Sequence, residues 1–137
     1  MKKIICIILI VVCIVVGQAR DKFTLRDYFC GDYYVFTDKD INNNSLYLGF
    51  CYMTKNANCQ KVCGEKMVCK NFEISSAIKR LKAKVKRVEI VEGMQVLYAF
   101  SPLINANIKI DGEIINLQFV EKGNDCIVGW PIILSDF

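Results

Sequence analysis

The chain has 137 residues, of which 53% are hydrophobic and 23% charged, and its formal net charge is +4. This length accommodates one small domain. Because the sequence contains no histidine, it excludes imidazole-based nucleophile pairs, proton shuttles and histidine metal ligands. We therefore expect a non-enzymatic protein without a cofactor.

The first 19 residues have the pattern of an export signal or a membrane anchor. Two lysines precede thirteen consecutive apolar residues, Ile4–Val16, and small residues at positions 17 and 19 provide a cleavage site before Arg20. A membrane-spanning helix needs about 20 apolar residues, which favours a cleaved signal over an uncleaved anchor. We predict a signal peptide or anchor at residues 1–19, a single domain at 20–137, and an extracytoplasmic location, secreted or membrane-anchored.

The first part of the domain predicts two strands. Tyr33–Thr37 is rich in aromatic and β-branched residues, and Leu46–Tyr52 alternates apolar residues with period 2. Three successive asparagines between them indicate a turn. Thr54–Gly64 is polar and predicts a loop.

A basic amphipathic helix is expected next. Its apolar stripe contains Ile74, Ala77, Ile78, Leu81 and Val85 at steps of three and four residues. An asparagine at position 71 is the expected N-cap, and a glutamate at position 73 would occupy the first turn, where a carboxylate suits the helix dipole.

The remaining sequence predicts short strands in meander order. Val88–Val91 and Gln95–Ser101 flank Glu92-Gly93 as one hairpin, and a second hairpin turns at Asp111-Gly112. The strands of this second hairpin start at Ile108 and at Ile115, and the second of them continues to Phe119. Cys126–Gly129 is predicted as a last strand. We interpret Trp130, which follows it, as a structural plug over the end of the sheet rather than a ligand platform.

These elements predict the α+β class: an antiparallel sheet of about five to seven strands with one amphipathic helix on one face. The other face of the sheet is expected to be partly exposed or covered by a partner.

Eight cysteines are present, two of them in the N-terminal apolar segment. The six others permit one or two disulfides, zinc binding by four thiolates, or scattered thiols. The zinc alternative is disfavoured, because the spacing is irregular and no CxxC motif occurs, and we expect no metal. The six candidates are Cys30, Cys51, Cys59, Cys63, Cys69 and Cys126.

Positive charge is concentrated in residues 70–87, which contain seven basic side chains and one acidic one. Such a segment suits a phosphate-rich partner, either nucleic acid or an anionic lipid or wall polymer, although a solvated helix face is the plain alternative. Outside the membrane, lipid headgroups and wall polymers are more available than DNA. The candidate binding residues are Lys79, Arg80, Lys82, Lys84, Lys86 and Arg87.

Three motifs in the second half resemble the YwmB family, exported or membrane-anchored proteins of Bacillota. They are Tyr98–Pro102, Ile114–Gln118 and Gly129–Phe137, in matching order and spacing. The resemblance implies a TATA-box-binding-like fold, meaning a curved antiparallel sheet with helices behind it, and an association with sporulation. It supplies no catalytic residues, and fold alone does not determine function.

Three functional hypotheses follow. The leading one is a non-enzymatic, exported binding or accessory protein of the cell envelope. The alternative is a nucleic-acid-binding domain that uses a basic helix at residues 74–87, which requires a cytoplasmic location. The third is a thiol-based redox or metal protein centred on Cys51–Cys69. The sequence does not define an oligomeric state.

Overall fold

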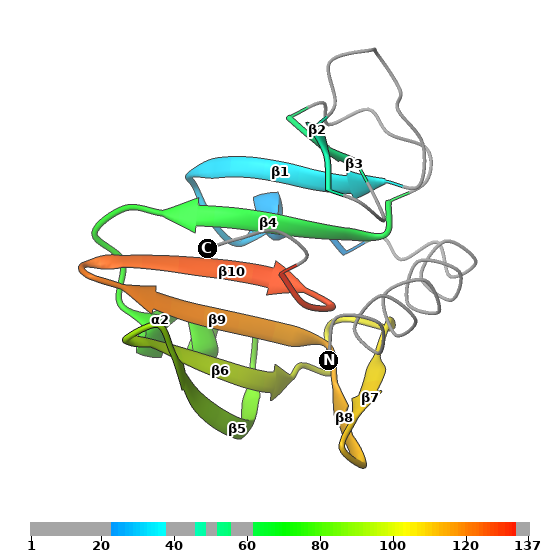
Figure 1. The fold of residues 1–137 in the computed structure, drawn as a ribbon, viewed down its shortest axis with the longest axis vertical. Helices are drawn as coiled ribbons and strands as arrows, with labels where there is room; N and C mark the ends of the chain where they lie inside the picture. Colours follow the sequence, from blue (N-terminus) through cyan, green and yellow to red (C-terminus); the bar gives the residue numbers. More distant parts are fainter. Residues whose placement is uncertain (1–22, 38–45, 49–51, 56–61, 134–137) are drawn as a thin grey trace.

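A computed structural model describes residues 23–37, 46–48, 52–55 and 62–133 (Figure 1). The described residues contain one 3₁₀ turn, ten strands and one α-helix. In chain order the elements are η1 (Leu25–Asp27), β1 (Asp32–Thr37), β2 (Leu46–Tyr47), β3 (Tyr52–Thr54), β4 (Gly64–Cys69), α2 (Ile74–Arg80), β5 (Lys84–Val91), β6 (Met94–Phe100), β7 (Ile108–Ile110), β8 (Glu113–Ile115), β9 (Leu117–Lys122) and β10 (Asp125–Trp130).

One antiparallel sheet dominates the fold, with the strand order β2-β3-β1-β4-β10-β9-β6-β5 (Figure 1). The strands β7 and β8 form a separate two-stranded hairpin. The α+β class is thereby confirmed, and the two-residue strand β2 makes the main sheet eight strands wide. Because β10 pairs with β4, the last strand joins the first half of the chain to the second.

The main core lies between the helix-bearing face of the sheet and the elements that cover it. Ala77 and Leu81 are fully buried there, and they pack in one cluster with Phe119 and Val128 from the centre of the sheet. Leu25 of η1 belongs to the same cluster. This packing confirms that one helix lies on one face of the sheet.

The opposite face of the sheet carries a second, smaller buried cluster. Val96, Val120 and Ile127 are buried together with Ile133, which follows β10. The backbone N–H of Ile133 donates to Oε1 of Gln118 at 2.7 Å and holds this segment on the sheet. At this place the chain's own C-terminal segment covers the face that we expected to be exposed or covered by a partner.

The helix is shorter than predicted, and residues 81–87 are not helical. The N–H of Ala83 donates to the carbonyl oxygen of Ile78, and that of Lys82 donates to the carbonyl oxygen of Lys79. Lys82 has a positive φ of 49°. These bonds and this φ are those of a Schellman C-cap, which normally has glycine at the left-handed position. The predicted helix over 74–87 is therefore wrong beyond Arg80, and Val85 lies on β5.

The start of the helix also differs from the prediction. Glu73 is the N-cap and makes no side-chain capping bond. Asn71, the expected cap, instead has a positive φ of 48°, and its N–H donates to Asp125 across the β9–β10 turn.

Strand β4 was missed by the sequence analysis, because its interior positions are charged. Glu65 and Lys66 are both buried, at 2% and 8% exposure. A strand with charged residues at both of these positions has no apolar alternation to detect. The predicted loop at 54–64 therefore covers the end of β3 and the start of β4, and residues 56–61 lie outside the described residues.

Two of the predicted strands are each divided into two shorter strands in the structure. Leu46 pairs with Met53 and Tyr47 with Tyr52, so the chain reverses within the segment predicted as one strand. The strand expected from Ile115 to Phe119 is split at Asn116, whose side chain accepts from the N–H of Ser101 and donates to its carbonyl oxygen.

The hairpins at Glu92-Gly93 and Asp111-Gly112 are confirmed, with positive φ at all four residues. Two-residue turns of type I′ require this backbone conformation.

Candidate functional site

The predicted basic residues lie where α2 leads into the edge strand β5. Lys79 and Arg80 end the helix, Lys82 lies in the C-cap, and Lys84, Lys86 and Arg87 belong to β5. The structure keeps these residues along one continuous segment, although not on one helix face. No acidic side chain occurs between residues 74 and 88.

Four of these residues form what we call the lysine strip: Lys79, Lys82, Lys84 and Lys86. All four are exposed. Within the part of the chain that the structure describes, none of them makes an ion pair. Lys82 and Lys86 are four residues apart, which places their Cα atoms within about 14 Å of each other. The strip is therefore a dense group of solvated positive charges.

The two arginines of the segment have structural contacts instead. The Arg80 guanidinium donates to the carbonyl oxygen of Tyr28 at 3.0 Å and lies 4.8 Å from the centre of the Phe72 ring. Arg87 forms ion pairs with Glu89 at 2.8 Å and with Asp111 at 2.5 Å. Both arginines are thus less available to an external anion than the lysines, a distinction that the sequence did not reveal.

Four of the six cysteines lie in the described residues. Cys30 is exposed, whereas Cys63, Cys69 and Cys126 are buried. Cys69 and Cys126 belong to the main core cluster, and Cys63 belongs to a different cluster with Phe36. Cys51 and Cys59, two of the four thiolates of the zinc alternative, lie outside the described residues. Among the described side chains, no group of three or more suitable ligands is placed to hold a metal ion.

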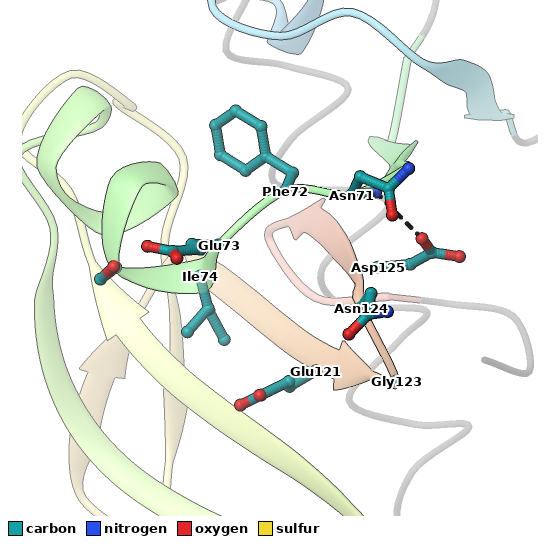
Figure 2. Close-up of a pocket in the computed structure, with 9 residues that line it drawn as sticks. Asn71, Phe72, Glu73, Ile74, Glu121, Gly123, Asn124 and Asp125 are labelled. Atoms are coloured by element: carbon teal, nitrogen blue, oxygen red, sulfur yellow. Dashed lines mark hydrogen bonds between the residues drawn. The ribbon is translucent and has the colours of Figure 1, made fainter.

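A pocket of about 520 Å³ lies at the opposite end of α2 from the lysine strip (Figure 2). The pocket is lined by Glu73 and Ile74 at the start of the helix, by Glu121 of β9, by Asn124 of the turn and by Asp125, the first residue of β10. The hydrogen bond from the Asn71 N–H, and then the one from Lys70, lower the pKa of Asp125. The three carboxylates of the pocket, those of Glu73, Glu121 and Asp125, would repel an anion. The pocket and the lysine strip therefore do not suit the same ligand.

Glu65, a buried carboxylate of β4, was not predicted from the sequence as a site residue. Its carboxylate accepts from the Thr24 hydroxyl at 2.6 Å and the Leu25 N–H at 2.8 Å, and also from the Tyr33 hydroxyl and the Trp130 indole N–H. Burial, followed by the hydrogen bond to Glu65, raises the pKa of Tyr33 well above its ordinary value. These contacts anchor η1 to β4 and agree with the interpretation of Trp130 as structural.

Comparison of the chain with protein-family models, with curated proteins and with solved structures gives no match. In the described part of the chain, no helix has both the length and the apolar character needed to cross a membrane.

Proposed function

We propose that this protein is a non-enzymatic binding module of the cell envelope, exported or anchored by residues 1–19, whose lysine strip contacts a phosphate-rich surface. One observation carries the proposal: four exposed lysines without ion-pair partners among the described residues lie in one short segment. Phosphodiester groups of anionic lipids and of wall polymers share the chemistry that such lysines recognise. The resemblance to the YwmB family, with its exported members, supports the same proposal.

The expected attraction is electrostatic and therefore sensitive to salt. Each lysine close to an anionic membrane contributes about 1 kcal/mol, and the effect declines within a Debye length of about 8 Å at physiological ionic strength. Four lysines on one segment would supply measurable binding at low salt without a deep pocket.

Replacing Lys82, Lys84 and Lys86 with glutamate should weaken binding about a hundredfold or more, because three favourable contacts become repulsive. Binding is measured by co-sedimentation with phosphatidylcholine vesicles, with and without phosphatidylglycerol, and by titration with poly(glycerol phosphate). The first reagent tests a lipid headgroup and the second a wall polymer.

The matched control changes Lys55, Lys109 and Lys122 to glutamate, three exposed lysines elsewhere on the molecule. It alters the net charge equally and should retain most of the binding. Equal loss in the two triple variants, or no binding of the unmodified protein to either polyanion, would contradict the assignment.

The alternative is a nucleic-acid-binding domain; the basic helix over residues 74–87 on which it was predicted ends at Arg80. Duplex DNA is nevertheless a useful third probe, and tighter binding to DNA than to both envelope polyanions would favour that alternative. Cell fractionation combined with intact mass measurement tests the location, and we expect a species that begins at Arg20 outside the membrane.

A further inference from the structure

Cys69 and Cys126 face each other directly across two neighbouring strands. They are register partners in the antiparallel pair formed by β4 and β10. Opposite residues of such a pair have Cα atoms about 4.5–5.5 Å apart and side chains on the same face. A disulfide requires a Cα separation of about 4.4–6.8 Å. The pairing of the two strands therefore sets a Cα separation that a disulfide can span.

A third cysteine lies beside this pair at the surface. Cys30 precedes Gly31, and a Cβ atom added to Gly31 would lie 3.4 Å from the Cα atom of Cys69. The backbone around Cys30 is thus in contact with the strand that carries Cys69. Cys30 is exposed, whereas Cys69 and Cys126 have 1% and 0% exposure.

We propose that Cys30, Cys69 and Cys126 form a thiol–disulfide exchange site, in which Cys30 reacts with an external disulfide and Cys69 and Cys126 become the final cross-strand disulfide. The substrate class is a small or protein-borne disulfide. The proposal does not rest on the lysine strip, so either can fail without the other.

The exchange balances in three steps. The thiolate of Cys30 attacks a disulfide RSSR, forms a mixed disulfide and releases one RS⁻. Cys69 then attacks the Cys30 sulfur, which forms a Cys30–Cys69 disulfide and releases the second RS⁻. Finally, Cys126 attacks the Cys69 sulfur and releases Cys30 as the thiolate with which the exchange began. In total, two protein thiols are oxidised, one external disulfide is reduced to two thiols, and the two protons lost by Cys69 and Cys126 protonate the leaving thiolates.

Burial explains why an exposed entry thiol is needed. Burial is the main cause and a neighbouring cysteine a smaller one, and together with the other charges nearby they raise the pKa of Cys69 to about 11 and that of Cys126 to about 12. Because the thiolate is the attacking species, both buried cysteines react slowly with a reagent in solution. The influence of Arg80 lowers the pKa of Cys69 against this trend, which favours Cys69 as the first buried nucleophile.

The test uses the full chain, reduced and then incubated under native conditions with oxidised glutathione. The reaction is quenched with acid, the remaining thiols are alkylated, and the protein is digested for mass spectrometry. We expect an intact mass lower by about 2 Da, corresponding to the two hydrogens lost, and a crosslinked peptide that joins Cys69 to Cys126. A stable glutathione adduct on Cys30, a dominant disulfide that omits Cys69 or Cys126, or unchanged thiols would overturn the proposal.

Variants separate the steps. Cys30→Ser should slow formation of the Cys69–Cys126 disulfide at least about tenfold, because only buried thiols remain at the site. Cys126→Ser should stop the reaction at a Cys30–Cys69 disulfide. Cys63→Ser is the matched control, since Cys63 is buried in a different cluster, and it should react at the rate of the unmodified protein. A Cys30→Ser rate equal to that of this control would eliminate the entry role.

Discussion

At the scale of single residues, Glu65 shows how a charged side chain becomes a core residue. Its side chain accepts four hydrogen bonds, from two side-chain hydroxyls, one backbone N–H and one indole N–H. A buried carboxylate is tolerated when donors of this kind replace its water shell. All four donors lie more than 30 residues away in the sequence, so no local pattern could have predicted them.

Glu65→Gln should lower the free energy of unfolding by about 2–3 kcal/mol, because the amide replaces one acceptor oxygen with an NH₂ group that faces donors. Urea unfolding followed by the fluorescence of the single tryptophan measures this loss. Glu113→Gln, in an exposed hairpin, should change stability by less than about 0.5 kcal/mol. Similar values for the two variants would mean that Glu65 is not the anchor described here.

At the scale of elements, the end of α2 is where the sequence prediction failed most clearly. An apolar residue at 81 followed by one at 85 fits a helix, and the segment from 84 to 91 also fits a strand. The competing strand is preferred because β5 pairs with β6 from Lys84 to Val91, with one irregularity in the register between Val85 and Arg87. A glycine at position 82 would have indicated the C-cap, but lysine occupies it.

Lys82→Gly should therefore stabilise the protein by about 0.5–1 kcal/mol, since glycine adopts a positive φ without the strain that a Cβ atom causes. Thermal and urea unfolding provide the measurement. The same substitution at Lys84, which lies in a strand, should destabilise by a similar amount. Destabilisation by both substitutions would argue against the Schellman cap.

At the scale of the whole molecule, stability should decrease from the centre of the sheet to its edges. β10 has hydrogen-bonded neighbours on both sides and contributes buried residues to both faces. β5 lies at one edge, where Val88 and Ile90 remain 51% and 70% exposed. The lysines of β5 oppose edge-to-edge association of such a strand.

Amide hydrogen exchange should follow this order. We expect the amides of β10 to exchange at least about a hundredfold more slowly than the outward-facing amides of β5, because the latter need no opening of the sheet. Exchange followed by mass spectrometry resolves these segments. Uniform rates across β10 and β5 would indicate that the sheet opens as one unit.

The sequence by itself determined the class of the fold, the two hairpins at Glu92-Gly93 and Asp111-Gly112 and the concentration of positive charge, because these depend on local periodicity, on turn chemistry and on composition. Only the tertiary structure decided where the helix stops and that β4 exists. It also decided that Arg80 and Arg87 contact other groups of the protein while the lysines of the strip are exposed, and that Cys69 lies opposite Cys126. Each of these features depends on a contact between residues distant in the sequence or on the pairing of strands. The energy of such contacts outweighs local propensity, and periodicity carries no information about which strand will be the partner.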